Sequence, residues 1–197
     1  MSTPTHDRNL KGSLITLLAL VLLGGVAWLV TQRDSESAAQ SEVGGPVQEQ
    51  FAPEDREAVT PFRARLLSGA AFDSADLAGR VAVFNVWGSW CGPCRKEAPA
   101  LARVARETAD QATFVGINVR DNDAAARAFE RGFEVPYDSV VSDDSDQALP
   151  AFGGALATAA VPSTVVVDRE GRIAARVVGI VTYRTLKALV DEVVAEP

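Results

Sequence analysis

The sequence predicts an α/β fold built on a mixed β-sheet, preceded by a single N-terminal transmembrane helix. After Pro61, strand-like segments rich in Val, Ile and Phe alternate with segments whose apolar residues follow helical spacing. The last two strand-like segments flank a turn at residues 168–171, as in an antiparallel hairpin. An uncharged apolar run fills residues 14–30. A parallel β-α-β unit followed by a hairpin and a final helix requires a sheet of mixed direction with helices packed on it.

Each element of the domain is expected from its local pattern. Segments predicted as strands carry β-branched and aromatic side chains between turn residues, and segments predicted as helices carry apolar side chains three or four positions apart. In chain order, strands are predicted at residues 63–67, 81–87 and 113–119, within 135–141, and at 164–167 and 174–178. Helices are predicted at residues 95–108, 124–132, 146–152 and 183–194.

Length and composition limit the possible classes of protein. The chain has 197 residues, 47% of them hydrophobic, which suffices for one globular domain and some additional segments. Its formal net charge of −7 argues against binding to a nucleic-acid backbone, which requires clustered lysine and arginine. Two cysteines and one histidine, His6, are too few to supply four Cys or His ligands to a structural zinc ion. No metal site is expected.

The N-terminal residues are predicted to anchor the protein in the cytoplasmic membrane by a single pass. The run at residues 14–30 reaches the lower limit for a helix that crosses the hydrocarbon core. Arg8 and Lys11 precede it, and positive charge favours the cytoplasmic side, so residues 1–13 are expected in the cytoplasm and the rest outside. A cleavable signal peptide is the alternative, with small residues at 37–39 as a weak cleavage site.

Residues 31–60 are expected to be a flexible linker. They are rich in Ser, Gln, Glu, Gly and Pro and contain few large apolar residues. Such a linker would let the folded domain, residues 61–197, stand clear of the membrane.

Cys91 and Cys94 are the main candidates for chemistry. They lie in a Cys-Gly-Pro-Cys segment that a strand-like segment precedes and a helix-like segment follows. A helix N-terminus offers free N–H groups and the positive end of a dipole, which stabilise a thiolate on Cys91 and make it the attacking nucleophile. Cys94 is close enough along the chain to resolve a mixed disulfide. Pro93 suits the first helical turn because it has no N–H to lose.

Other roles for the two cysteines are a structural disulfide, inert buried thiols or half of a metal site. The strand before and the helix after the pair favour redox chemistry over these roles. A disulfide across so short a loop would restrict little chain entropy, so it would stabilise the fold only slightly. Copper binding would want a further His or Met ligand, but His6 and Met1 are cytoplasmic in the predicted topology, which leaves only the two sulfurs.

The segment at residues 85–99, N-V-W-G-S-W-C-G-P-C-R-K-E-A-P, resembles the membrane-anchored TlpA/ResA-like thiol-disulfide oxidoreductases of the thioredoxin superfamily. The resemblance extends over residues 60–196. It implies a thioredoxin-like fold and a helix kinked at Pro99. It also implies a redox-active disulfide between Cys91 and Cys94, with no other cofactor.

The resemblance assigns roles to individual residues. Val161 and Pro162, ahead of a β-branched strand, match the cis-proline loop that packs against the dithiol and binds the substrate backbone, so their peptide bond is expected to be cis. Glu97 matches a glutamate near the dithiol that would take the proton from Cys94. The alternative is that Glu97 only complements the helix dipole. The substrate-binding candidates are Trp90, Gly92, Pro93, Val161 and Pro162.

Two further features follow from the resemblance. Asn85 stands where thioredoxin has a buried Asp, and its amide cannot accept a proton. Residues 122–152 resemble an insertion of helix and strand that this family carries. Its acidic stretch at residues 142–146 is expected to be a solvated loop, because the ligand spacing and glycine of a calcium loop are missing.

These observations predict a membrane-anchored bacterial enzyme that reduces disulfides of other proteins outside the cytoplasm. The resemblance makes apocytochrome c, during cytochrome c maturation, the leading substrate. A reductant in an oxidising compartment implies a transmembrane thiol carrier as electron donor. The Gly-Pro pair between the cysteines is that of thioredoxin, with a potential of about −270 mV, and favours a reductant. The alternatives are a disulfide-forming oxidant of the same fold and a copper-handling or redox-sensing binding module.

Overall fold

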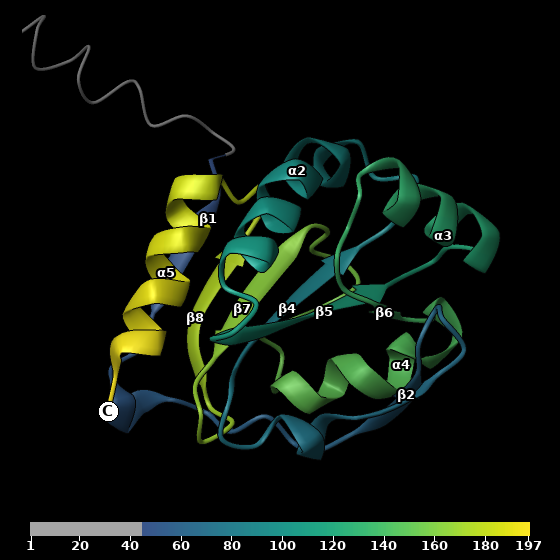
Figure 1. The fold of residues 1–197 in the computed structure, drawn as a ribbon. Helices are drawn as coiled ribbons and strands as arrows, with labels where there is room; N and C mark the ends of the chain where they lie inside the picture. The colour runs from purple at the N-terminus through teal and green to yellow at the C-terminus, as the bar shows by residue number, and fades with distance from the viewer. Residues whose placement is uncertain (1–44) are drawn as a thin grey trace, which may run out of the picture. The chain divides into compact units, whose positions relative to one another are not determined.

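The computed structural model describes residues 45–197, in which strands and helices alternate (Figure 1). The predicted cytoplasmic residues 1–13, the predicted membrane segment 14–30 and the first part of the predicted linker lie outside these residues. No helix within residues 45–197 has the length and hydropathy that a membrane crossing requires. The N-terminal anchor therefore stays a prediction.

A six-stranded sheet forms the centre of the domain. Its strands are β1 (Val47–Gln50), β4 (Val81–Trp87), β5 (Ala112–Asn118), β6 (Ser139–Val140), β7 (Ser163–Val167) and β8 (Ile173–Val178). They are arranged in the order β1-β8-β7-β4-β5-β6. β5 pairs in parallel with β4 and with β6, whereas the pairs β4–β7, β7–β8 and β1–β8 are antiparallel. The predicted mixed sheet is confirmed.

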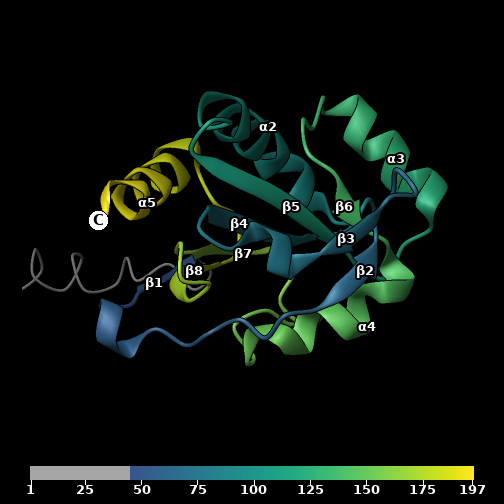
Figure 2. The ribbon, with the colours of Figure 1, turned by 60° about the horizontal axis from the view of Figure 1, so that its bottom comes forward.

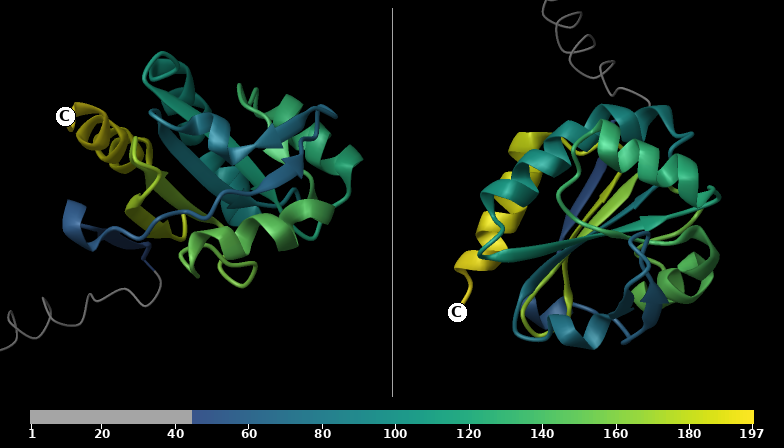
Figure 3. Two further views of the ribbon diagram at one scale, coloured as in Figure 1. Left: turned by 90° about the horizontal axis from the view of Figure 1, so that it is seen from below. Right: turned by 45° about the vertical axis from the view of Figure 1, so that its right-hand side comes forward.

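Helices cover both faces of this sheet (Figures 2 and 3). The α-helices are α2 (Gly92–Glu107), α3 (Asp123–Gly132), α4 (Ser145–Ala148) and α5 (Tyr183–Ala195). Short 3-10 helices are formed by Pro53–Asp55, Ser74–Leu77, Ser142–Asp144 and Leu149–Phe152. α2 and α5 pack on one face. The other face carries α4 and a two-stranded sheet of β2 (Arg63–Arg65) and β3 (Ala71–Asp73).

Strand β4 lies in the core because its side chains are apolar on both faces of the sheet. All seven of its residues are buried. Val81 and Val83 face α2 and α5, whereas Phe84 and Val86 face the layer that contains α4. Strand side chains alternate between the two faces, so a nearly continuous apolar run needs cover on both. The strand has the bounds predicted for it, residues 81–87.

The other predicted elements are present, with shifts at their ends. β5, β7, β8, α2, α3 and α5 correspond to the predictions at residues 113–119, 164–167, 174–178, 95–108, 124–132 and 183–194. The predicted strands at 63–67 and 135–141 shorten to β2 and β6, and the helix at 146–152 divides into α4 and a 3-10 turn. α2 begins early because Cys91 acts as its N-cap and Pro93 lies in its first turn.

The predicted linker, residues 31–60, has to be corrected for the part that the structure describes. β1 pairs with β8 at the edge of the sheet, and Phe51 and Val59 pack against the core. All four residues of β1 are exposed, so main-chain hydrogen bonds rather than buried side chains hold this strand. An exposed edge strand can carry polar residues throughout, which gives it the composition of a linker. The folded unit therefore begins at Pro46.

The turn between β7 and β8 is organised by Asp168, which is 2% exposed. Its carboxylate accepts the main-chain N–H groups of Glu170 and Arg172, and it pairs with the guanidinium groups of Arg56 at 3.1 Å and Arg172 at 2.9 Å. Burial alone would raise the pKa of Asp168, but these hydrogen bonds outweigh burial and hold that pKa below its ordinary value. Arg56 also pairs with Glu196 at 2.6 Å. The cluster thus joins the hairpin to both ends of the folded unit.

Candidate active site

Cys91 and Cys94 form a disulfide where strand β4 leads into helix α2. The two sulfurs are 2.09 Å apart, and only 3% of Cys91 and 1% of Cys94 are exposed. Cys91 is the N-cap of α2, and the main-chain N–H of Cys94 donates to Cys91 Sγ over 3.1 Å. N–H groups at a helix N-terminus favour negative charge, so this position favours a thiolate on Cys91 in the reduced protein.

The predicted proline loop lies against Cys91. The Val161–Pro162 peptide bond is cis, as predicted. Cys91 Sγ lies 4.0 Å from the carbonyl oxygen of Val161. Because β7 pairs antiparallel with β4, this loop reaches the same edge of the sheet as the disulfide although it is distant in sequence. The other predicted substrate-binding residues are exposed around the disulfide: Trp90, Gly92 and Pro93.

The side chain of Trp90, the residue before Cys91, is exposed but is held in place by a hydrogen bond. It is 50% exposed, and its indole N–H donates to the carbonyl of Val119 at 3.2 Å. The guanidinium of Arg120 lies 4.7 Å from the centre of the Trp90 ring. Arg120 has a φ of 49°, a backbone region that residues other than glycine seldom adopt. The loop after β5 thus holds a cation on the ring that flanks the reactive sulfur.

Asp121 holds the loop that precedes the disulfide. Its carboxylate accepts the main-chain N–H of Ser89 at 2.6 Å, the hydroxyl of Ser89 at 2.8 Å and the side-chain N–H of Asn118 at 3.1 Å. Burial would raise the pKa of Asp121, but these bonds hold it below its ordinary value. This contact was not predicted. A signal for it exists, since Ser89 and Asp121 closely follow two parallel strands whose carboxyl ends meet at one edge.

Glu97 is buried behind the disulfide, with 1% of the residue exposed. One carboxylate oxygen accepts the side-chain N–H of Asn85 at 2.9 Å, and the other accepts the main-chain N–H of Val181 at 2.9 Å. Burial raises the pKa of Glu97 to about 7, and these hydrogen bonds offset only part of the effect. The carboxyl can therefore gain or lose a proton near neutral pH. A residue that only complemented the helix dipole would not need this burial.

A cavity of about 10 Å³ lies beside Cys94, lined also by Asn85 and Tyr137. Its volume is close to the minimum that holds one water molecule. Asn85 faces the cavity and donates to Glu97, so it connects the carboxyl with the space beside Cys94. Burial, and then the charge of Glu97, raise the pKa of Tyr137 above its ordinary value. In this oxidised form, the hydrogen bonds of the Glu97 carboxylate within the described residues go to Asn85 and Val181 and not to a sulfur.

The sequence of the whole domain agrees with a known family. Residues 52–190 match the family described as Redoxin. The chain belongs to the Redoxin family. The thiol:disulfide interchange protein DsbE of Pseudomonas aeruginosa is 35% identical over 127 residues, which are 62% of this chain and 67% of that protein. The thiol:disulfide interchange protein HelX of Rhodobacter capsulatus is 29% identical over 185 residues, 92% of this chain and 96% of that protein.

One solved structure and one further relative are also similar to this chain. A DsbF homologue from Corynebacterium diphtheriae has a TM-score of 0.67 at 30% identity, over 78% of this chain and 96% of that chain. The thiol-disulfide oxidoreductase ResA of Bacillus subtilis is 30% identical over 116 residues, 58% of this chain and 62% of that protein. The protein is thus a thioredoxin-like thiol-disulfide oxidoreductase of the ResA/DsbE type, as the sequence resemblance indicated.

The prediction that the acidic loop at residues 142–146 is solvated has to be corrected, because one of its carboxylates is buried. Asp144 is 9% exposed and accepts the main-chain N–H of Arg65 at 2.7 Å and its guanidinium at 2.8 Å. These bonds tie the loop to β2, which is a structural role. Within residues 45–197, no three Cys, His, Asp or Glu side chains are grouped so as to hold a metal ion.

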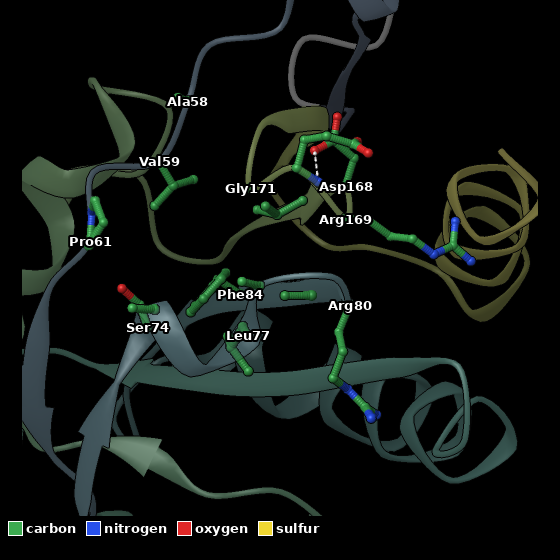
Figure 4. Close-up of a pocket in the computed structure, with 15 residues that line it drawn as sticks. Ala58, Val59, Pro61, Ser74, Leu77, Arg80, Phe84, Asp168, Arg169 and Gly171 are labelled. Atoms are coloured by element: carbon green, nitrogen blue, oxygen red, sulfur yellow. Dashed lines mark hydrogen bonds between the residues drawn. The ribbon is translucent and has the colours of Figure 1, made fainter. Parts of the chain in front are cut away.

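A cavity of about 270 Å³ lies near the opposite end of β4 from the disulfide (Figure 4). Phe84 and the hairpin turn at residues 168–171 line it, and its walls are mainly apolar. The guanidinium of Arg169 donates to carbonyls at the end of α5, and that of Arg80 donates to Thr113, so neither points into the cavity (Figure 4). The edge that carries the disulfide therefore remains the candidate active site of this Redoxin-family protein.

Proposed function

We propose that the protein reduces disulfides in other proteins on the outer side of the cytoplasmic membrane, with Cys91 as the attacking thiol and Cys94 as the resolving thiol. The observation that carries these roles is the asymmetry of the pair. Cys91 Sγ receives a helix N-terminal N–H and lies beside the carbonyl of Val161, two contacts that Cys94 Sγ does not make among residues 45–197. Both cysteines are nearly buried, so these contacts rather than burial support Cys91 as the attacking thiol.

The reaction proceeds through two exchanges. The Cys91 thiolate attacks one sulfur of the substrate disulfide, the substrate S–S bond breaks, and the other substrate sulfur leaves as a thiolate that takes up a proton. Cys94 then loses its proton and attacks Cys91 Sγ, which breaks the mixed disulfide and releases the second substrate thiolate. Two electrons pass to the substrate, and the Cys91–Cys94 disulfide seen in the structure is the oxidised product.

Glu97 is the proposed acceptor of the Cys94 proton, through the cavity that Asn85 lines. Its pKa of about 7 means that it is ionised, and able to accept, above neutral pH. Replacement Glu97→Gln is expected to slow resolution of the mixed disulfide by about 10²-fold at about pH 8, the low end of general-base effects. The loss should shrink below about pH 6, where wild-type Glu97 is already protonated. Rapid-mixing measurements of substrate thiol release against pH check this.

The first exchange provides the control for Glu97→Gln. Formation of the mixed disulfide depends on the Cys91 thiolate. In Glu97→Gln the rate of this first step should therefore change much less than the rate at which Cys94 resolves the mixed disulfide. Equal slowing of both steps at every pH would assign Glu97 a purely structural role.

The membrane location and the partners belong to this proposal. We infer that residues 14–30 anchor the chain with its N-terminus in the cytoplasm, which the apolar run and the preceding positive charges support. We infer apocytochrome c as a substrate from the resemblance to TlpA/ResA-like proteins. A transmembrane thiol carrier is the inferred electron donor. A reductant in an oxidising compartment becomes oxidised with each reaction, so electrons from the cytoplasm must reduce its disulfide again.

The reduction potential tests the direction of the reaction. The full chain is equilibrated in graded thiol/disulfide buffers, and the state of Cys91 and Cys94 is read by alkylation. A potential below about −220 mV is expected, as for thioredoxin-like reductants. A value near about −120 mV would instead make the protein a disulfide-forming oxidant.

A further inference from the structure

Three exposed cationic residues either follow Cys94 in the chain or contact the ring of Trp90, and we call them the dithiol cations: Arg95, Lys96 and Arg120. Arg95 directly follows Cys94 in α2, and Arg120 lies on the ring of Trp90, the residue that precedes Cys91. Apart from the contacts of Arg95 and Arg120 with aromatic rings, no ion pair or hydrogen bond within residues 45–197 involves these three side chains. Among residues 45–197, the only Arg and Lys side chains with neither an ion pair nor a hydrogen bond are the dithiol cations, Arg131 and Arg184.

The carboxylates nearest in sequence to the dithiol cations are already engaged. Asp121, next to Arg120, accepts hydrogen bonds from Ser89, Asn118 and Asn122. Asp123 pairs with Arg127 at 3.5 Å, and Glu97 is buried against Asn85 and Val181. Although the chain has a net charge of −7, Arg95 and Arg120, which lie on the rings of Phe133 and Trp90, have no carboxylate partner within residues 45–197. A partner's carboxylate could pair with it without displacing an internal contact.

Aromatic side chains lie beside two of these cations. Arg95 lies 5.2 Å from the ring centre of Phe133 and 5.9 Å from that of Phe129. Together with Ser89 these residues line an open cavity of about 400 Å³ between α2 and α3. Phe129 is buried and Phe133 is half-buried, whereas the ring of Trp90 is 50% exposed. An extended peptide joined to Cys91 can therefore rest neighbouring side chains on aromatic surface and place a carboxylate at a guanidinium.

We propose that this surface selects substrate polypeptides that carry Asp or Glu next to their disulfide. The inference rests on the proposed attack by Cys91 and adds the class of substrate. Guanidinium groups bind carboxylates through paired N–H donors, and unpaired charge around a site also accelerates encounter with an oppositely charged partner. The surface is continuous with the site of exchange, so bound acidic residues would lie within a few positions of the attacked cysteine.

The test uses the reduced full chain and three synthetic peptides with the same internal disulfide. The residues flanking their cysteines are Asp, Asn or Lys. Second-order rate constants are measured by rapid mixing at low salt and at about 0.5 M NaCl, where exposed charges are largely screened. The expected order is Asp over Asn over Lys, with about a tenfold or greater difference between Asp and Lys peptides that largely disappears at high salt.

A charge-reversal variant, a neutral variant and a matched control locate the effect. In Arg95→Glu/Arg120→Glu the order of the peptides is expected to invert, and in the neutral variant Arg95→Gln/Arg120→Gln it is expected to flatten. The matched control is Arg80→Glu/Arg106→Glu, which makes the same change in net charge where β4 begins and where α2 ends, and it should keep the wild-type order. Each rate is compared with that of the Asn peptide in the same variant, which removes any general change in Cys91 reactivity.

Equal wild-type rates for the Asp and Lys peptides would overturn the proposal, as would a preference that the Arg95/Arg120 variants retain or that the Arg80/Arg106 control loses. Failure of the wild-type protein to reduce any of the three peptides would be a different result. It would contradict the proposed reductase function itself, together with the inference that rests on it.

Discussion

Replacement of Cys94 by Ala is expected to leave the protein covalently joined to its substrate through Cys91. Replacement of Cys91 by Ala should instead abolish exchange, with a loss of at least about 10³-fold in rate, as for other nucleophile deletions. The helix N-terminal N–H and the carbonyl of Val161 both contact the sulfur of Cys91 and not that of Cys94, so the first sulfur is expected to attack the substrate. Mass spectrometry after mixing with a disulfide peptide, without added thiol, measures the adduct.

The variant with both cysteines replaced by Ala is the control for non-covalent association. An adduct that forms through Cys94 in the Cys91→Ala protein would contradict the assigned roles. Comparable adduct yields in the two single variants would mean that these contacts do not distinguish the sulfurs.

Replacement of Asp168 by Ala is expected to give the largest loss of stability outside the core, about 3 kcal/mol in the free energy of unfolding. The change removes the carboxylate that holds the hairpin turn and leaves Arg56, whose side chain is 5% exposed, with Glu196 as its remaining ionic partner. A buried cation that loses a partner is destabilising because that partner no longer compensates for the cation's lost hydration. Urea unfolding at about pH 7 measures the difference.

An exposed ion pair supplies the control for Asp168. Asp191→Ala removes the pair with Lys187 within α5 and should change stability by about 0.5 kcal/mol or less. The fold holds the pKa of Asp168 below its ordinary value, so its stabilisation is present above the ordinary carboxyl pKa and is lost as pH falls through the folded-state pKa. The difference between wild type and Asp168→Ala should therefore narrow in acid. A difference independent of pH would show that the charge of Asp168 contributes nothing.

Much of the fold was predictable because its elements have strong local patterns. The Val- and Phe-rich segment at residues 81–87 predicted the strand β4 with its observed bounds, and the Cys-Gly-Pro-Cys segment between strand and helix predicted the redox pair. β1 was not predictable, since its exposed side chains carry no pattern and main-chain bonds to β8 hold it in place. The contact of Asp121 with Ser89 depends on the register between β4 and β5, which local pattern does not specify.

The sequence by itself determined the class of chemistry, because two cysteines at a helix start have reactivity that local geometry controls. It also indicated Glu97 and the proline loop, through resemblance to a family. Only the tertiary structure decided three features of the site: the carbonyl of Val161 near Cys91, the burial that raises the pKa of Glu97, and the placement of the Arg120 guanidinium on the ring of Trp90. Burial and charge at a site depend on residues that meet through strand order, and that order is fixed by packing of the whole sheet.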